Sequence, residues 1–201
     1  MKSKKFDSTY TDYQTQRSSL RRWLRQFYLQ SARGKLGGAT MDFGCGVGEL
    51  LATLPPGSMG LEYNQATVEY CRARGLDVSW YDGTADDWSL SAISPGRSFE
   101  TMIISHVLEH LDDPLAVLRC LLNSAYGYGV RKVLVIVPGK AGFQVDHTHR
   151  TFVDRTMLSA ATETAGSRFR YASASYFPGN IKVMGDWFPH HELQVIYESN
   201  V

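Results

Sequence analysis

The sequence contains few cysteines, and no two of them stand at short spacing. Cys45, Cys71 and Cys120 are odd in number and form no CxxC pattern. Such a set argues against a disulfide framework and against a thiolate zinc site. We therefore expect three reduced thiols with structural roles.

Long apolar runs are also absent. No run approaches the roughly 20 residues that a membrane-spanning helix needs. The N-terminal stretch MKSKKFDSTY lacks the apolar core of a signal peptide. We expect a cytoplasmic protein, and 201 residues without internal repeats fit a single domain.

Net charge is small, at +1, but it is distributed unevenly. Residues 1–40 hold nine Lys or Arg against two Asp, a balance of +7, so the rest of the chain is acidic by −6. Within residues 18–31 the apolar positions follow one helical face: Leu20, Trp23, Leu24, Phe27 and Tyr28. We predict a basic amphipathic helical segment over residues 1–36, followed by one domain over 37–201.

Such a basic helix is either a solvated face over a core-packed stripe or a weak contact to an anionic membrane surface. The overall charge is near zero and no separate RNA-binding module is visible, so we expect no nucleic-acid partner.

Strand-like and helix-like segments alternate after this region. Apolar runs predict strands at residues 40–43, 58–62, 77–81, 99–105 and 132–137. Helices are predicted from Glu49, from the Asn64 cap to Gly75, and from Asp113 and Pro114. Strands that alternate with helices imply parallel pairing and a three-layer α/β sandwich. The last third predicts a helix over 154–166 and strands at 168–176 and 193–197.

The stretch MDFGCGVGELL places Gly44, Gly46 and Gly48 directly after the first strand. In parallel sheets the first βα loop is the usual ligand contact, and glycines let a ligand approach the main chain. A tight βα turn is the alternative. The dinucleotide fingerprint G-x-G-x-x-G fails because its sixth position is Glu49, and no GK[ST] follows for a P-loop.

Four motifs, each at a strand end, resemble those of class I S-adenosylmethionine-dependent methyltransferases, particularly the type 11 and type 23 groups. They are DFGCGVG at 42–48, GLE at 60–62, Asp82, and SHVLEHL at 105–111. The resemblance covers residues 38–140 well. It implies a Rossmann-like, mostly parallel seven-stranded sheet of order 3-2-1-4-5-7-6 with an antiparallel C-terminal strand. It also implies S-adenosyl-L-methionine as cofactor and S-adenosyl-L-homocysteine as product.

The same resemblance assigns the cofactor-binding residues. They are Asp42, Gly44, Cys45, Gly46, Gly48, Glu62, Tyr63, Asp82, Gly83, Ser105 and His106. Glu62 would take the two ribose hydroxyls, and Asp82 would accept from the adenine amino group. A helix cap or a surface charge is the alternative for each acid. We expect Glu109 and His110 to fix the loop.

The segment DHTHRTF at 146–152 resembles the D-x-x-H-x-x-F segment of many such enzymes. It places Asp146, His149 and Phe152 near the acceptor, together with His106. We predict that His149 is a general base or acceptor-binding residue, against the alternative of a structural histidine. Tyr10 and Tyr13, in the N-terminal segment, are predicted to form a lid over the acceptor, with helix packing as the alternative.

Two histidine pairs leave a metal site open as an alternative. His147 and His149, with Asp146, and His190 and His191, with Glu192, offer two-histidine, one-carboxylate sets. Sequence spacing does not bring either set together, and we predict no metal.

The predicted function is methyl transfer to a small-molecule, lipid or saccharide acceptor by a monomer or homodimer. A non-catalytic S-adenosylmethionine-binding accessory protein and an NAD-dependent oxidoreductase are the alternatives.

Overall fold

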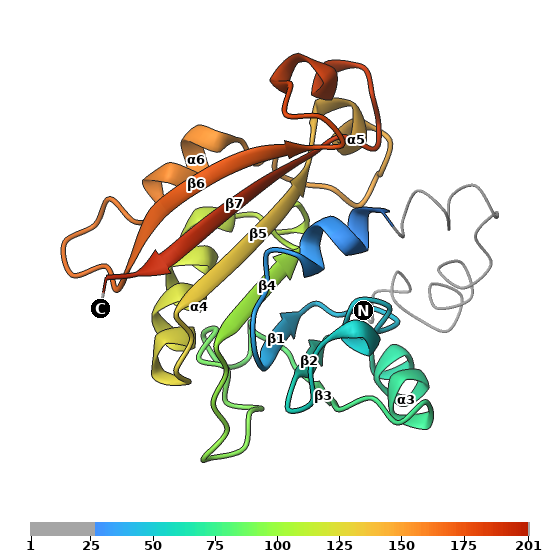
Figure 1. Cartoon of the computed structure of the whole chain (residues 1–201), viewed down its shortest axis with the longest axis vertical. Coiled ribbons are helices and arrows are strands. Elements are labelled where there is room, and N and C mark those ends of the chain that lie inside the picture. The colour runs from blue at the N-terminus through green and yellow to red at the C-terminus, as the bar shows by residue number, and fades with distance from the viewer. Residues whose placement is uncertain (1–26, 201) are drawn as a thin grey trace.

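The computed structural model describes residues 27–200 (Figure 1). Tyr10, Tyr13 and most of the predicted basic helix therefore lie outside the described residues. Residues 27–33 are helical. The remaining elements, in chain order, are β1 (Thr40–Phe43), η1 (Leu51–Thr53), β2 (Met59–Glu62), α3 (Gln65–Ala73), β3 (Val78–Trp80), β4 (Thr101–Ser105), η2 (Leu108–His110), α4 (Pro114–Gly127), β5 (Lys132–Pro138), α5 (Lys140–Gln144), α6 (Arg155–Ala160), β6 (Phe169–Phe177), η3 (Lys182–Asp186) and β7 (Glu192–Ser199).

The strands form one seven-stranded sheet of order β3-β2-β1-β4-β5-β7-β6. The first five strands pair in parallel, whereas β7 runs antiparallel to both β5 and β6. The predicted order and the antiparallel C-terminal strand are confirmed. Because β7 is antiparallel to β5, it begins beside the carboxyl end of β5, where Glu192 is in register with Pro138.

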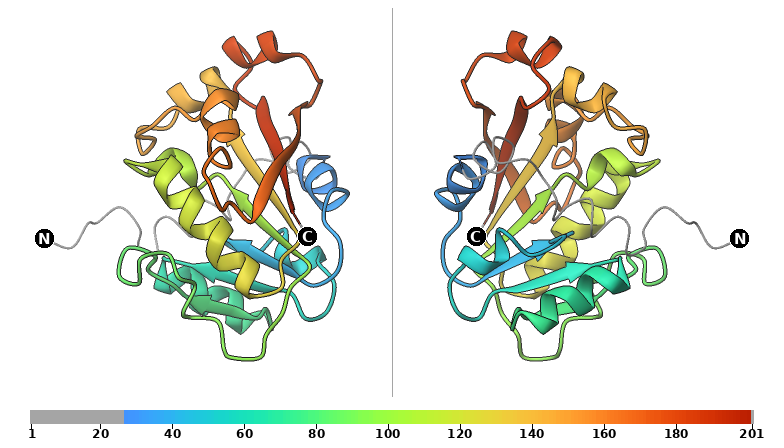
Figure 2. Two further views of the ribbon diagram at one scale, coloured as in Figure 1. Left: turned by 90° about the vertical axis from the view of Figure 1, so that its left-hand side faces the viewer. Right: turned by 90° about the vertical axis from the view of Figure 1, so that its right-hand side faces the viewer.

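Both faces of the sheet are covered, as the side views in Figure 2 show for α4 and the helical residues 27–33. Alternate side chains of the central strands enter two cores. Met102 and Ile104 pack on the face that α4 covers, whereas Ile103 packs with Tyr28 and Ala32 on the other face. This two-sided burial explains why β4 and β5 read as continuous apolar runs.

Two predicted helices are wrong in length. The helix expected from Glu49 is reduced to the single 3-10 turn η1, because Pro55 and Pro56 follow it at once. Leu54 precedes the first of these prolines and is extended, with ψ of 159°, as a residue before proline prefers.

The helix expected over 154–166 begins as predicted, because the Asp154 side chain accepts a hydrogen bond from the Met157 amide. It ends at Ala160. Thr162 then bonds locally, since its hydroxyl donates to the Ser159 carbonyl and accepts from the Tyr171 amide. Threonine competes for helical hydrogen bonds in this way, and the chain turns towards β6.

Among the described residues, no helix combines the length and apolar character needed to cross a membrane.

Candidate functional site

The glycine loop after β1 holds three left-handed residues. Gly44, Gly46 and Gly48 have φ of +73°, +53° and +73°. A Cβ at Gly44 would stand 2.4 Å from Val107 Cγ2, and one at Gly48 would stand 2.4 Å from Leu76 Cδ1. The loop therefore needs glycine both for its backbone conformation and for its close contacts.

Glu62, the last residue of β2, ties this loop to the next strand. Its carboxylate accepts hydrogen bonds from the Gly46 amide at 2.9 Å and from the Asn64 amide at 2.8 Å. Burial raises the pKa of Glu62 although these amides work against the shift. Asn64 in turn caps α3. The half-buried carboxylate of Glu62 is thus held beside the glycine loop.

Asp42 lies in the strand just before the glycine loop, and Cys45 lies within the loop. Asp42 is 3% exposed and lies in β1, in register with Gly60 on one side and Ile103 on the other. A hydrogen bond with the Cys71 thiol, followed by burial, raises the pKa of Cys45. Cys45 is therefore a neutral thiol packed under the loop.

Asp82 and Gly83 follow β3. Asp82 is half-buried and accepts from the Thr84 amide at 3.0 Å. Its neighbour Asp86 is occupied by four donors, from Tyr81, Ser89 and Ser91. These hydrogen bonds give Asp86 a structural role and leave Asp82 as the acid at the end of β3.

Gly83 and Tyr63 lie nearby at the ends of β3 and β2. A Cβ at Gly83 would stand 2.2 Å from the Trp88 ring, so glycine is required there for packing. The Tyr63 side chain is 56% exposed. The Tyr63 carbonyl accepts a hydrogen bond from the Trp80 indole at 2.8 Å.

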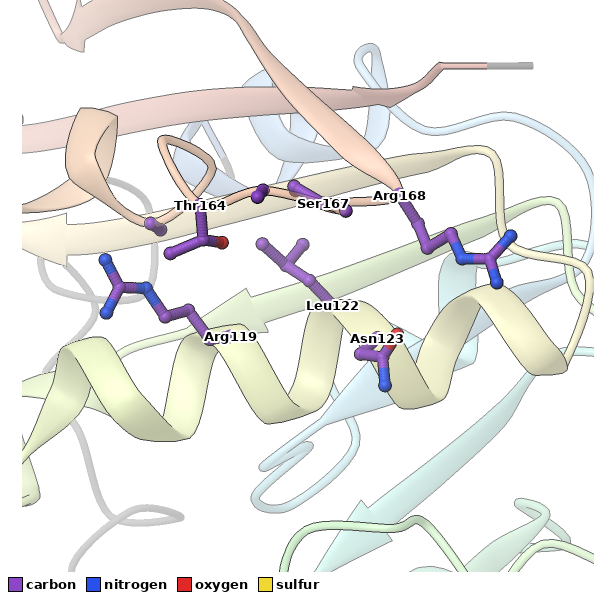
Figure 3. A pocket seen from close by; sticks show the side chains of 9 residues that line it. Arg119, Leu122, Asn123, Thr164, Ser167 and Arg168 are labelled. Atoms are coloured by element: carbon purple, nitrogen blue, oxygen red, sulfur yellow. The ribbon is translucent and has the colours of Figure 1, made fainter.

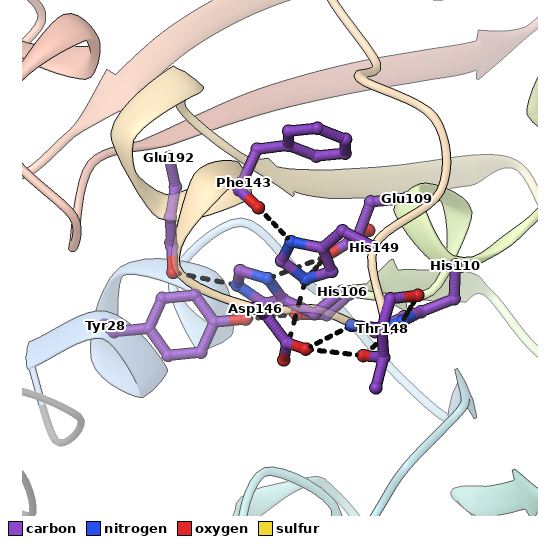
Figure 4. A network of polar contacts seen from close by, with 10 residues as sticks. Tyr28, His106, Glu109, His110, Phe143, Asp146, Thr148, His149 and Glu192 are labelled. Atoms are coloured by element: carbon purple, nitrogen blue, oxygen red, sulfur yellow. Dashed lines mark hydrogen bonds and ion pairs between the residues drawn. The ribbon is translucent and has the colours of Figure 1, made fainter. Parts of the chain in front are cut away.

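His106, directly after β4, is held between two carboxylates (Figure 4). Its Nδ1 lies 3.1 Å from Glu109 Oε1 and its Nε2 lies 3.0 Å from Glu192 Oε1. Only a doubly protonated imidazole can donate from both nitrogens. Burial alone would lower the pKa of His106, but the two carboxylates outweigh it and raise the pKa to about 10. His106 is a fixed imidazolium, with a φ of +54° that a non-glycine residue seldom adopts.

The helical residues 27–33 reach the same place. The Tyr28 hydroxyl hydrogen-bonds to the Ser105 hydroxyl, and the Tyr28 ring meets the His106 ring edge-on at 5.9 Å between centroids. Tyr28 thereby covers the end of β4 from the side opposite α4.

The segment 146–152 folds over the ends of β4 and β5. His149 Nδ1 lies 2.9 Å from the Phe143 carbonyl, and the two rings of these residues stack at 5.3 Å. Asp146 accepts from the Thr148 amide and hydroxyl at 2.8 and 2.6 Å. Phe152 is 41% exposed and meets Phe143 edge-on. Asp146 and His149 are thus brought to the cluster around His106 (Figure 4).

Glu109 connects His106 with His149. It is fully buried, and His149 Nε2 lies 3.9 Å from its Oε1 and 3.9 Å from Asp146 Oδ2. The rings of His110 and His149 meet edge-on with centroids 4.9 Å apart. The structure therefore unites Glu109, His110 and His149 instead of either histidine pair considered from the sequence.

Among the described residues, neither His190 nor His191 belongs to a group of three possible metal ligands. His191 is 1% exposed, its Nε2 lies 3.0 Å from the Ile181 carbonyl, and its ring stacks on Tyr176. His147 and His190 are exposed.

A separate hollow lies between α4 and residues 161–168 (Figure 3). Arg119, Leu122 and Asn123 line it from α4. No predicted site residue lines this hollow, and we do not assign it to the site.

Sequence reasoning missed Glu192 and Tyr28 as parts of this site and gave Glu109 and His110 only a structural role. Glu192 is 86 residues from its partner His106, so no local pattern could reveal the contact. The one available signal for Glu192 was the predicted antiparallel last strand, because such a strand begins beside the carboxyl ends of the parallel strands.

Comparisons with known proteins agree with this geometry. The sequence matches the family model of a methyltransferase domain, type 23, over residues 13–170. A search of curated proteins finds no match.

Solved structures of several methyltransferases share the fold. An S-adenosylmethionine-dependent methyltransferase from Archaeoglobus fulgidus aligns with a TM-score of 0.66 at 18% identity, over 96% of this chain and 100% of that chain. Magnesium protoporphyrin IX methyltransferase from Synechocystis PCC 6803, with bound S-adenosylhomocysteine, has a TM-score of 0.66 at 13% identity, over 97% and 96%. The N-methyltransferase NodS from Bradyrhizobium japonicum WM9, also with S-adenosylhomocysteine, has 0.60 at 15% identity, over 88% and 87%. At these low identities the likeness shows a shared fold and no more.

Proposed function

This chain belongs to the class I S-adenosylmethionine-dependent methyltransferases, and we propose that it methylates a small-molecule, lipid or saccharide acceptor held over the ends of β4 and β5. The observation that carries the proposal is the carboxylate of Glu62, fixed beside a glycine loop of three left-handed residues. A nearby cluster of polar side chains is available for an acceptor.

The glycine loop and Glu62 fit the cofactor. Glu62 donates nothing and offers acceptor oxygens, which suits the two ribose hydroxyls. Gly44 and Gly46 are half-buried and leave main chain accessible, and Asp42 lies in β1 just before them, where it can orient the loop or the methionine ammonium. Cys45 contributes its backbone, since its thiol is packed away beside Gly60.

Residues at the ends of neighbouring strands would hold the adenine and methionine parts of S-adenosylmethionine. The half-buried Asp82 and the exposed ring of Tyr63 flank the ends of β3 and β2, with Gly83 allowing the close turn. Ser105 and His106 lie at the end of β4, where we place the methionine end. Both imidazole N–H groups of His106 are occupied by Glu109 and Glu192, so His106 would line this end of the cofactor without donating a hydrogen bond to it.

S-adenosylmethionine supplies an electrophilic methyl group on a sulfonium. When bound, it would transfer that methyl group to an acceptor held in line with the carbon–sulfur bond, whose electrons would stay on sulfur, and the acceptor's proton would pass to the Nε2 of His149 or to solvent. The protein chiefly aligns the acceptor and excludes water. His149 has one lone pair, at Nε2, because its Nδ1 donates to the Phe143 carbonyl. We assign that lone pair to the acceptor side, with Asp146 and Phe152.

Exposed apolar residues border this segment. Val145 is 67% exposed next to Asp146, and Ile181, Val183 and Trp187 are exposed in and around η3, which packs against α5. An apolar rim of this kind supports an acceptor with an apolar part, as a lipid intermediate has.

The proposal is tested with S-adenosylmethionine labelled in its methyl group. The full chain is incubated with metabolite, lipid and saccharide fractions of a cell extract, and label is measured in each fraction and in RNA and protein. Label in a small-molecule, organic-soluble or saccharide product supports the proposal. Label confined to RNA or protein would overturn the acceptor class.

Calorimetric titration separates the remaining alternatives. Binding of S-adenosylmethionine and S-adenosylhomocysteine without NAD supports the cofactor assignment. Binding without transfer to any fraction would favour an accessory role.

A further inference from the structure

We propose that Glu109, His110 and His149 form a binding site for one divalent transition-metal ion, with Asp146 as a further ligand. Each of the first three residues offers one ligand atom, and these atoms lie within 4.8 Å of one another. Two imidazoles and one carboxylate are a set that binds such ions in proteins. The sequence predicted no metal, because it could not place His110 beside His149.

The spacing is close to that of a loaded site. Ligand atoms held about 2.1 Å from a common ion stand roughly 3 to 3.5 Å apart. The side chains therefore need to close by about 1 Å, within the reach of small χ rotations. Asp146 Oδ2 already lies 3.9 Å from His149 Nε2, on the side facing this space.

Hydrogen bonds fix both histidines in the form that binds metal. His149 Nδ1 donates to the Phe143 carbonyl at 2.9 Å, which leaves a lone pair on Nε2. His110 Nδ1 lies 3.3 Å from the Thr148 carbonyl and 3.1 Å from the Thr148 hydroxyl. That hydroxyl is occupied in donating to Asp146, so His110 Nδ1 must be the donor. Metal-bound histidines are oriented in the same way by carbonyls and carboxylates.

Glu109 provides an independent observation. The side chain is fully buried, and Oε1 is held by His106. Among the described residues, Oε2 has no hydrogen-bond partner. A buried carboxylate oxygen without a partner is costly, and a cation would supply one.

The donor atoms of the cluster, two imidazole nitrogens and carboxylate oxygens, decide which ion it prefers. The imidazole nitrogens favour Zn²⁺ or Co²⁺ over Mg²⁺, Ca²⁺ and Mn²⁺, which prefer oxygen ligands.

One consequence rests on the proposed function. An ion here would use the Nε2 lone pair of His149, so His149 would contact the acceptor through the metal instead of removing its proton directly. An open coordination position would bind an acceptor oxygen and lower its pKa.

The test is metal titration of the full chain after removal of bound metal with a chelator. Co²⁺ is followed by its visible absorption, and Zn²⁺ by calorimetry and competition. We expect one equivalent to bind, with no competition from Mg²⁺. His110→Ala and His149→Ala should weaken binding at least about 10-fold. The matched control is His147→Ala, which removes an exposed histidine from the same loop and should bind as wild type does.

No Co²⁺ or Zn²⁺ binding by the wild type would overturn the proposal, as would equal binding by the His149→Ala and His147→Ala variants. Far-UV circular dichroism and S-adenosylhomocysteine titration report whether each variant is folded. His149→Gln and Asp146→Asn serve as milder changes if an alanine variant does not fold. Metal is measured without any acceptor, so this outcome is independent of whether the proposed methyl transfer is found.

Discussion

At the scale of single residues, His149 is set apart from the other histidines by its surroundings. Its side chain is 8% exposed, and its Nε2 faces Glu109 and Asp146. In the two proposals above, His149 has a role towards the acceptor, either as a base or through a bound ion. Neither way requires it to contact the ribose or adenine of the cofactor.

We therefore predict that His149→Ala lowers turnover by about 100-fold, which is typical for loss of an acid–base group, and leaves S-adenosylmethionine affinity within about 2-fold. Turnover is measured with the labelled acceptor fraction, and affinity by calorimetry. His147→Ala serves as the control and should retain both. Equal loss of turnover and of cofactor binding would mean that His149 is structural.

The positions of Glu62 and Asp82 in the sheet were more readily predicted than the contacts around His106. Glu62 and Asp82 follow apolar runs that could be read as strands, so their place at the strand ends followed from the parallel sheet. The contact between His106 and Glu192 could not be read in this way. It depends on the register of β7 with β5, which the sequence alone does not specify.

At the scale of elements, the glycine loop and the turn after β4 pack against each other. Gly44 accommodates Val107 Cγ2 in the space where other residues have a Cβ. Gly75 offers a matched comparison, since its φ of +76° is close to that of Gly44 but no atom lies within 4 Å of its missing Cβ.

We predict that Gly75→Ala costs about 1 kcal/mol of unfolding free energy from backbone strain, whereas Gly44→Ala costs about 2 to 4 kcal/mol from strain and collision together. Urea unfolding gives both values. In the double variant Gly44→Ala, Val107→Ala, the nearest remaining side-chain atom is Val107 Cβ at 3.8 Å. The cycle should show a favourable coupling of about 1 kcal/mol or more, and additive costs would refute the collision.

The turn after β3 depends on Asp86. Burial alone would raise its pKa, but hydrogen bonds from Tyr81, Ser91 and Ser89 lower it to about 2, from 3.8. The folded state therefore binds this proton more weakly than the unfolded state. The stability that Asp86 contributes is present above pH 3.8 and is lost as the pH falls towards 2.

We predict that Asp86→Asn destabilises the protein by about 1 to 2 kcal/mol at neutral pH, after allowance for solvent screening, and that this difference shrinks from about pH 5 to about pH 3. Urea unfolding over that range measures it. The control is Asp87→Asn, which changes an exposed neighbouring carboxylate and should show no such trend. A pH-independent cost would show that the Asp86 charge does not matter.

Elements were predictable where one local signal decided them. The caps Asn64, Asp113 and Asp154 all begin helices as predicted. The helix expected from Glu49 failed because the two prolines outweigh the favourable apolar spacing before them. Helix starts are set by a single side chain, whereas helix lengths depend on what the following residues can bond to.

At the scale of the whole molecule, the site joins parts that are far apart in the chain. Glu62 holds the glycine loop, His106 directly follows β4, and Glu192 is the first residue of β7. Such a site orders many elements at once, so a ligand bound there should stabilise the entire fold and not only a loop.

We predict that S-adenosylhomocysteine at about 100 times its dissociation constant adds roughly 2.7 kcal/mol to the unfolding free energy, which raises Tm by roughly 5 to 10 °C for a domain of this size. Glu62→Ala removes a charged acceptor and should weaken binding about 10- to 100-fold, so about half of this rise should disappear at the lower figure and most of it at the higher, at the same ligand concentration. Glu69→Ala changes an exposed acid on α3 and should keep the full rise. Scanning calorimetry with and without ligand measures all three proteins. An equal rise in both variants would restrict Glu62 to holding the Gly46 amide, and no rise in the wild type would contradict the placement of the cofactor at this loop.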